Sequence, residues 1–254
     1  MNTKLFIITI ILFTLGCKKD NKIETPNETP TTNSGVLVFN ITAKINNQNL
    51  FYNTTMYKGN ATDSFKVSLL KYYLSNFKLK DVNNNTYSIN EYVINEHNTS
   101  TISFTLNNIS PGNYNSLNML IGVDKEKNIS GSQTGALDPI NGMFWDWNTG
   151  YIFFKLEGEY KNSLTTTLKP ITIHIGGFEG TFNCLKEVNL NSIDLKVVND
   201  KKTIVNIDLN LNELLNTPKT LEFDNIAISS TSKDAKIIAD NYFDMFSVTS
   251  IINP

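Results

Sequence analysis

The sequence contains no arginine, only two histidines and only two cysteines. All 22 basic residues are therefore lysines, and 24 acidic residues bring the formal net charge to −2. This balance, without a basic block, argues against nucleic-acid binding, because proteins that bind phosphate backbones cluster their positive charge. Two histidines leave little material for acid–base catalysis, and neither a phosphate-binding loop nor an HExxH motif occurs. We therefore expect a protein that is not an enzyme.

The first residues have the features of a bacterial export signal. Lys4 precedes an apolar stretch, Leu5–Leu15, that is too short to cross a bilayer as a helix. The stretch ends in Thr14–Cys17, a Thr-Leu-Gly-Cys sequence that resembles a lipobox. We expect residues 1–16 to be a lipoprotein signal peptide and Cys17 to carry the lipid, with a plain secretory peptide as the alternative. We expect the lipid to anchor the protein in the outer membrane of the cell envelope, either facing the periplasm or exposed at the cell surface.

A tether is expected between the lipid and the folded part. Residues 17–34 are polar and contain Pro26 and Pro30, so they cannot bury enough apolar surface to fold. We expect residues 35–254 to form one domain and the protein to be a monomer. Cys184 is the only other cysteine, which excludes an internal disulfide in the mature protein. It suits a small buried apolar group, and a role as a soft metal ligand is the alternative.

Alternating apolar and polar residues predict several strands, because successive side chains of a strand point to opposite faces. The turn signal at Ser110–Asn113 predicts that the strands on either side of it form a hairpin. The spacing of the strands predicts an all-β fold, an antiparallel β-sandwich with Greek-key-like connections. The predicted strands are Leu37–Ile45, Phe65–Lys80, Ile102–Leu106, Leu117–Val123, Tyr151–Glu157, Pro170–Ile175, Val188–Val198 and Thr203–Leu211.

One short helix is expected near the C-terminus. Ser232 is a suitable N-cap, and Ile238, Tyr242, Met245 and Phe246 have the spacing of one helical face. Such a face buries apolar surface only against another element. We therefore expect this helix to pack on the sandwich.

The segment Gly122–Gly158 differs from the rest of the chain. It contains both tryptophans, Trp145 and Trp147, and an unusual density of glycine and aromatic residues. Between Val123 and Tyr151 it shows no clear periodicity, which predicts a long loop. Long loops in compact domains tend to be functional.

Motifs in and around this segment resemble those of a known family. In chain order they are Lys71–Phe77, Gly122–Asp124, Leu137–Pro139, Gly142–Tyr151, Phe154–Gly158, His174–Phe178 and Ala239–Phe246. The most specific feature is the Trp-x-Trp block followed by Gly-Tyr, with a later His-x-Gly-Gly. Together these motifs resemble the copper-binding MbnP-like proteins of bacterial envelopes, and the resemblance covers most of the mature domain.

The resemblance implies a β-sandwich with a mononuclear copper site made from histidines and a tryptophan oxidised to kynurenine. It also implies a dihaem peroxidase-like partner, because that oxidation needs a separate oxidant. Trp145 and Trp147 are both candidates for the modification. His174 is the best candidate ligand, because strand alternation turns it away from the apolar side of Ile173 and Ile175. Structural roles are the alternative for His174 and for both tryptophans.

The second histidine, His97, matches no family position. It lies in the polar run Glu96–Asn98, which predicts a loop. A copper site with two histidines would need His97 from this loop. The alternatives for a further ligand are Met143, Met119 or a carboxylate.

Two further interpretations of the Gly-rich segment stay open. Asp124, Asn128 and Asp138 carry oxygen ligands suited to calcium, although turn capping is the favoured role for Asp and Asn in such a segment. Both tryptophans and Tyr151 also suit an aromatic platform on which a surface lipoprotein binds a glycan or a protein without metal. The sequence leaves these alternatives unresolved.

Overall fold

The computed structural model describes residues 33–59, 62–131, 133–146, 148–165, 167–230 and 233–254. Cys17 and residues 1–16 lie outside the described residues, as do Trp147 and the predicted helix cap Ser232. Within the described part of the chain, no helix has the length and apolar content needed to cross a membrane. The described residues belong to one folded unit.

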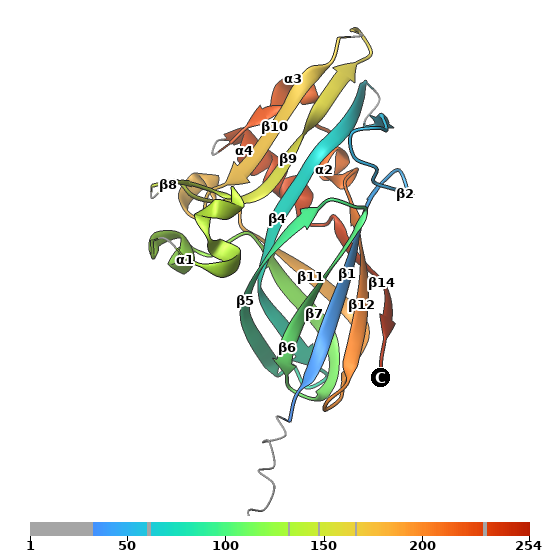
Figure 1. Cartoon of the computed structure of the whole chain (residues 1–254), viewed down its shortest axis with the longest axis vertical. Coiled ribbons are helices and arrows are strands. Elements are labelled where there is room, and N and C mark those ends of the chain that lie inside the picture. The colour runs from blue at the N-terminus through green and yellow to red at the C-terminus, as the bar shows by residue number, and fades with distance from the viewer. Residues whose placement is uncertain (1–32, 60–61, 132, 147, 166, 231–232) are drawn as a thin grey trace, which may run out of the picture. The chain divides into compact units, whose positions relative to one another are not determined.

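Two β-sheets form the body of this unit (Figure 1). The described residues of the first, sheet A, follow the order β14 (Phe246–Ile252), β12 (Lys202–Asn210), β1 (Gly35–Ile45) and β2 (Gln48–Asn49), with β6 (Thr101–Ile109) also paired to β1. Sheet B follows the order β11 (Lys186–Val197), β7 (Gly112–Ile121), β4 (Asp63–Asp81), β9 (Gly150–Asn162), β10 (Lys169–Gly176) and β13 (Ile228–Ser229). Three further strands join sheet B: β3 (Tyr57–Lys58) and β5 (Thr86–His97) pair with β4, and β8 (Phe144–Asp146) pairs with β9.

The predicted all-β sandwich is confirmed, and both sheets are mixed. β1 pairs in parallel with β12, and β10 pairs in parallel with β13, whereas the other pairs are antiparallel. A parallel pair needs a long crossover connection, so its two strands are far apart in sequence. Local periodicity carries no information about such a pairing.

The core lies between the inner faces of the two sheets. Every second residue of β1 is fully buried, as the alternation in this stretch predicts. The ring of Phe39 in β1 stacks on that of Phe104 in β6, with 4.8 Å between the ring centroids. It also packs against Phe77 of sheet B at a centroid distance of 6.0 Å, so it connects the two sheets. Truncating such a ring to alanine typically costs about 3–5 kcal/mol.

Short helices cover the part of sheet B that sheet A does not reach. They are α2 (Glu213–Asn216), α3 (Phe223–Ile226) and α4 (Lys233–Tyr242), and Figure 1 shows α3 and α4 behind β9 and β10. Tyr242 of α4 packs on Phe154 of β9 at 5.4 Å, and Phe223 of α3 packs between Phe65 and Tyr160 at 5.2 Å from each. The predicted C-terminal helix is confirmed as α4.

The helix is shorter than its apolar pattern indicated. It ends at Tyr242, so Met245 follows the helix and Phe246 begins β14. The β-branched residues of β14 pair with β12 and complete sheet A, which provides more backbone hydrogen bonds than another helical turn. Met245 and Phe246 are still buried, but as part of the sandwich.

The hairpin predicted around Ser110–Asn113 is wrong. β6, before this turn, pairs with β1 in sheet A, whereas β7, after it, pairs with β4 and β11 in sheet B. The turn therefore carries the chain from one sheet to the other. A turn sequence fixes the reversal of direction but not the strand that the chain meets afterwards.

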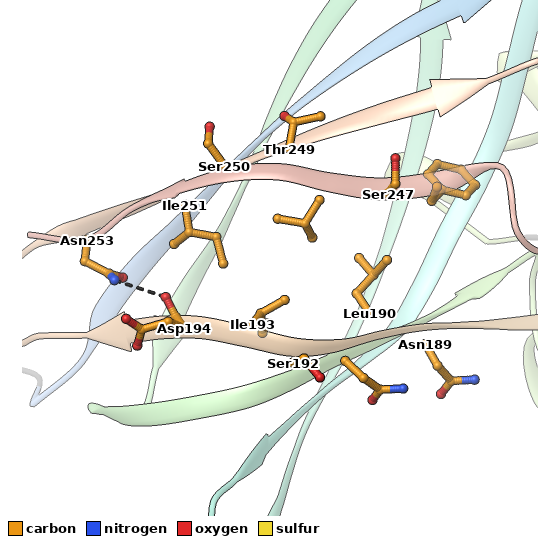
Figure 2. Close-up of a pocket in the computed structure, with 13 residues that line it drawn as sticks. Asn189, Leu190, Ser192, Ile193, Asp194, Ser247, Thr249, Ser250, Ile251 and Asn253 are labelled. Atoms are coloured by element: carbon orange, nitrogen blue, oxygen red, sulfur yellow. Dashed lines mark hydrogen bonds between the residues drawn. The ribbon is translucent and has the colours of Figure 1, made fainter.

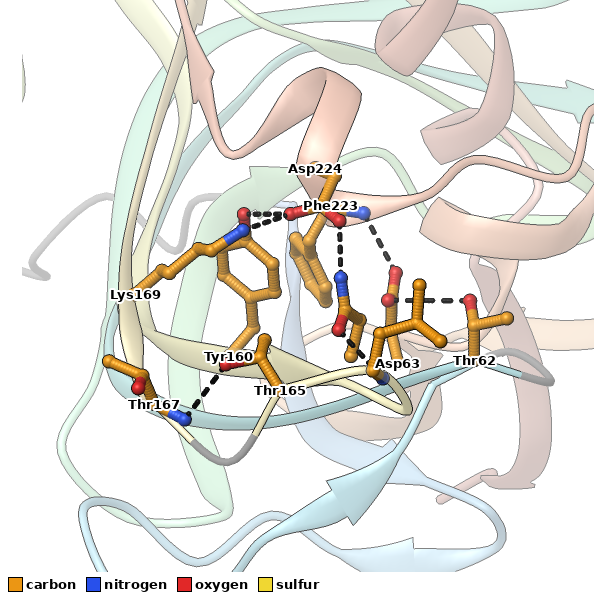
Figure 3. Close-up of polar contacts among 10 residues, drawn as sticks. Thr62, Asp63, Tyr160, Thr165, Thr167, Lys169, Phe223 and Asp224 are labelled. Carbon is orange, nitrogen blue, oxygen red and sulfur yellow. Dashed lines mark hydrogen bonds and ion pairs between the residues drawn. The ribbon is translucent and has the colours of Figure 1, made fainter.

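A polar cluster fixes α3 to the β9–β10 end of sheet B (Figure 3). The Asp224 carboxylate accepts hydrogen bonds from Tyr160 at 2.9 Å, from Lys169 at 2.6 Å and from Asn162. The Lys169 ammonium beside it, together with these bonds, holds the pKa of Asp224 below its usual value. Asp63, which is buried, accepts a bond from the Phe223 N–H at 2.8 Å. The cluster therefore supplies a hydrogen-bond acceptor to the backbone N–H at the start of α3.

Candidate functional site

The stretch between Val123 and Tyr151 was expected to be a long loop, but its described residues fold against the outer face of sheet B. We use "outer face" for the side of sheet B that carries Lys71, Tyr73, Lys155 and His174 and is turned away from sheet A. The segment contains α1 (Lys125–Ile129), two single-turn 3₁₀ helices (Gly135–Leu137 and Pro139–Asn141) and β8. It therefore forms a structured cap on the sheet.

Two buried tyrosines hold this cap. Tyr73 of β4 donates to the Ala136 carbonyl at 2.8 Å, and Tyr151 of β9 donates to the Leu137 carbonyl at 2.7 Å. Their rings meet edge to face at 5.9 Å. Because Tyr151 is fully buried and its hydroxyl is bonded, it is not available for the aromatic platform that we considered for a glycan or partner protein.

Two lysines of the outer face bind the end of the cap that leads into β8. Lys71 donates to the Asn141 carbonyl at 3.0 Å, and Lys155 donates to the Gly142 carbonyl at 3.3 Å. Gly142 adopts a left-handed φ of 68°, which favours glycine at this turn. These contacts fix where β8 starts and so where Trp145 lies.

His174 lies on the outer face of β10, as strand alternation predicts. Its side chain is half-buried, and its Nε2 lies 2.8 Å from Glu157 Oε1 on the neighbouring strand β9. The Lys155 ammonium lies 3.6 Å from the same carboxylate oxygen. Burial lowers the pKa of His174, Glu157 opposes this shift and Lys155 adds to it, so the ring is mostly neutral at neutral pH.

The hydrogen bond to Glu157 decides which nitrogen of His174 can bind a metal. An ionised carboxylate only accepts hydrogen bonds, so Nε2 carries the proton of the neutral ring. Nδ1 then keeps its lone pair. A carboxylate that orients a histidine in this way is the usual partner of a metal-binding imidazole.

Trp145 lies against the end of β10, the strand that carries His174. A Cβ atom added to Gly176 would meet Trp145 Cζ3 at 2.6 Å, so the half-buried indole rests directly on the backbone of Gly176. Gly176 follows His174 by two positions on β10, about 7 Å further along the strand and across a register shift between Ile175 and Gly176. The predicted ligand and one of the two predicted tryptophans therefore lie at neighbouring positions along the same strand.

His97 is in a strand rather than in the predicted loop. It is the last residue of β5, only 2% exposed, and its Nε2 lies 2.9 Å from the Tyr72 hydroxyl. Burial lowers the pKa of His97 to about 4, against the opposing effect of the backbone of Thr99 and Ser100. His97 is therefore a neutral core residue at neutral pH.

The register of sheet B separates the two histidines. His97 is paired with Leu70, Leu70 with Leu156, and Leu156 with Ile173, so all these residues point to the inner face. His174, the next residue, points to the outer face. Three strand spacings, about 14 Å, also separate the two backbones. One metal ion cannot bind both imidazoles in this fold.

The other sulfur ligands that we considered are all buried. Met119, Met143 and Cys184 are each 0% exposed. Cys184 donates its thiol to the Phe182 carbonyl, and burial raises its pKa to about 11, so it stays protonated, as expected of a buried apolar group. Within the described residues, no group of three His, Cys, Asp or Glu side chains is arranged to hold a metal.

The residues that we considered for calcium cap turns and helices. Asp124 accepts from the Lys127 N–H and begins α1, and Asp138 accepts from the Ile140 N–H. Asn128 donates to the Val123 carbonyl and accepts from the Tyr151 N–H. These bonds are the capping role that we favoured, and they leave the three side chains with separate backbone partners.

Glu157, Lys155 and Gly176 belong to the site although no sequence pattern singled them out as individual candidates. Lys155 and Glu157 alternate on one face of β9, and the antiparallel register of β9 with β10 sets them beside His174. The register would have revealed this neighbourhood, because directly opposed residues share a face. The contact of Gly176 with Trp145 had no signal in the sequence beyond the glycine itself.

The comparisons with known proteins identify the family. The profile of the MbnP family matches residues 34–235. The chain belongs to the MbnP family. Among solved structures, MbnP from Methylosinus trichosporium superposes with a TM-score of 0.55, covering 86% of this chain and 98% of that chain at 12% identity. At this identity the similarity shows a shared fold. No curated protein matches the chain.

Membership of the MbnP family raises the question of whether the residues fit copper. The outer face supplies one imidazole nitrogen, His174 Nδ1, with an orienting carboxylate, and an indole rests on Gly176 two residues further along β10. An intact indole is a poor ligand because its nitrogen lone pair belongs to the ring. The described residues therefore fit a mononuclear site only if a tryptophan of this MbnP-family chain is converted into a ligand.

Proposed function

We propose that this MbnP-family protein is a lipid-anchored, monomeric envelope protein that binds copper on the outer face of β9 and β10. The ligands would be His174 Nδ1 and the aryl amine of Trp145 after its oxidation to kynurenine. The observation that carries the proposal is the packing of Trp145 on Gly176, two residues along β10 from His174. The link between the MbnP family and copper-related function supports it.

The modification creates the second nitrogen ligand. Oxidation opens the indole between C2 and C3, C2 leaves as formate, and the former ring nitrogen becomes an aryl amine. The oxidant in this proposal is two equivalents of peroxide, each taking up two electrons at a dihaem peroxidase-like partner and being reduced to water, and a further water molecule then hydrolyses the N-formyl group to release formate. An imidazole and an amine are ligands that suit copper. Trp145 is half-buried rather than sealed, so an external oxidant has a path to it.

Glu157 and Lys155 would prepare His174 for binding. Glu157 holds Nε2 protonated and fixes the plane of the ring, which leaves Nδ1 as the donor. The Lys155 ammonium lies 3.6 Å from the Glu157 carboxylate, and the bond from Lys155 to Gly142 connects this pair to the cap that carries Trp145. The bound copper would supply redox or Lewis-acid chemistry at an exposed face.

Metal analysis and peptide mass spectrometry of protein purified from its native host test the proposal. We expect bound copper and a mass gain of about 4 Da on Trp145, because the ring loses a carbon and gains an oxygen. His174→Ala should lose copper and keep the mass gain, and Trp145→Phe should lose both. His97→Gln is the matched control and should retain both. Copper-free protein with an intact Trp145 would refute the proposal.

The lipid anchor needs a separate test. Cys17→Ser removes the proposed acylation site and should release the protein from membranes into the soluble fraction. The tether and the domain are unchanged in this variant, so copper binding should persist. Continued membrane retention of the Cys17→Ser protein would show that acylation of Cys17 is not what holds it.

A further inference from the structure

The free edges of the two sheets face each other on one side of the sandwich. Among the described residues, β14 ends sheet A and pairs only with β12, and β11 ends sheet B and pairs only with β7. A groove of about 550 Å³ lies between them, lined by Asn189 to Asp194 of β11, by Phe246 to Ile251 of β14 and by Asn253. Figure 2 shows apolar side chains of both strands directed into this groove.

The two edges differ in how they are protected against strand pairing. β11 carries Lys186, Glu187, Asp194 and Lys196, and a bulge at Ser192 with a φ of 58° interrupts its register. Charges and bulges of this kind are how natural edge strands avoid pairing with other chains. β14 has the sequence FSVTSII, without charge or proline. Its one irregularity is a register shift opposite Asn206 and Ile207.

The groove has an apolar floor, polar rims and one charged end. Val248 and Ile251 of β14 are half-buried in the floor, and Ser247 and Ser250 are exposed on the rim. Asn253 closes one end by donating to the Asp194 carbonyl and accepting from the Lys196 N–H. Asp194 is the only charged residue of the lining, and among the described residues its carboxylate forms no ion pair.

We propose that β14 is a docking edge for an extended segment of a partner protein. This segment begins with a basic residue and carries no other charge. The segment would add antiparallel to β14, so that its N-terminal end lies at the C-terminal end of β14. Asp194 stands at this end and would pair with the basic residue. Backbone hydrogen bonds to the free edge give the affinity, and small apolar side chains at alternate positions fill the floor.

Binding of a synthetic peptide to the mature full-length chain with Cys17→Ser tests the proposal. The probe is the peptide Lys-Thr-Val-Thr-Val-Thr with a blocked C-terminus. Its binding is followed by amide exchange and by NMR shifts of the protein. We expect slower exchange and shifts confined to β14 and the facing residues of β11. A peptide with proline at its third and fifth positions is the matched control and should not bind, because it cannot complete the backbone pairing.

Two variants separate the charge from the edge. Asp194→Asn should weaken binding of the Lys peptide about two- to fivefold, as for an exposed ion pair, and leave binding of a peptide that begins with Thr unchanged. Ser247→Lys adds a charge to the exposed edge and should abolish binding of both peptides. Both residues are exposed, so folding should be preserved, and circular dichroism checks this.

Three outcomes would overturn the proposal. The first is the absence of any peptide-dependent change in β14. The second is a dimer in sedimentation with protected β14 edge amides, which would assign the groove to a second copy. The third is protection of these amides that disappears when residues 18–32 are removed, which would assign the groove to the tether. Copper content has no part in this test.

Discussion

The two histidines of this chain lie in the same sheet but in opposite environments. His97 points inward, is 2% exposed and bonds to a tyrosine, whereas His174 points outward, is half-buried and bonds to a carboxylate. Burial lowers the pKa of both, but only His174 has a charged partner that opposes the shift. The face of the sheet on which a histidine lies therefore decides whether it is a structural core residue or is available to bind a ligand.

The strongest test of this contrast is the pH dependence of stability. The pKa of His97 is about 4 in the folded protein and about 6.5 when exposed, so protons bind the unfolded chain first. The contribution of the neutral His97 ring to the unfolding free energy is complete above about pH 6.5. It decreases by at most about 3 kcal/mol as the pH falls towards 4. Denaturant unfolding between pH 7 and 4 should show this loss. His97→Gln should flatten the curve, and an unchanged curve would contradict the assignment.

Gly176→Ala should disturb the outer face most. The new Cβ would lie 2.5 Å from the Tyr151 carbonyl and 2.6 Å from Trp145, and the carbonyl cannot move without disturbing β9. We expect a loss of about 1–3 kcal/mol in unfolding free energy, typical of overpacking, and a change in tryptophan fluorescence. Gly135→Ala is a useful comparison, because no atom lies near its added Cβ and only its φ of 65° opposes the change. Wild-type stability and fluorescence in Gly176→Ala would show that Trp145 does not rest there.

Tyr72→Phe should reveal the cost of leaving His97 without its partner. The buried Nε2 of His97 loses the hydroxyl at 2.9 Å, which typically costs about 1–3 kcal/mol. Denaturant unfolding at pH 7 measures this cost. The double variant Tyr72→Phe with His97→Leu should recover part of it, since both polar groups are then removed. Strictly additive losses would mean that the pair does not interact.

Glu157→Gln should have the smallest effect on stability and a larger one on metal binding. The pair with His174 is partly exposed, so its loss should cost less than about 1 kcal/mol of unfolding free energy. If His174 binds copper as proposed, copper affinity should fall about 10–100-fold, the usual effect of removing an orienting carboxylate. Competition with a chelator measures the affinity. Lys66→Met is the matched control, because it breaks a remote ion pair between Lys66 of β4 and Glu159 of β9.

Regular strands with one buried face were predictable from the sequence. β1, β4 and β12 follow the alternation of their apolar residues closely, because one face of each is sealed in the core. β5 was missed because many residues on both of its faces are exposed or half-buried, so Thr86–His97 shows no clear alternation. β14 was missed because its first residues also fit the helical spacing of α4.

The candidate site was predictable in its residue types but not in its geometry. His174 and Trp145 stand out as a scarce histidine and a clustered tryptophan, and alternation gives the correct face for His174. The neighbouring Glu157 and the exclusion of His97 depend on the register across four strands. Register is set by turns, bulges and packing between distant segments, which local patterns do not encode.

The sequence by itself determined the class of the fold, the positions of its most regular strands and the family resemblance, because these depend on short-range periodicity and on local motifs. Only the tertiary structure decided that β6 and β7 belong to different sheets, that the two histidines face opposite ways and that Trp145 rests on Gly176. Each of these follows from pairing between residues far apart in the chain. Such pairing is governed by the burial of a common core, in which every strand competes with all others for its partners.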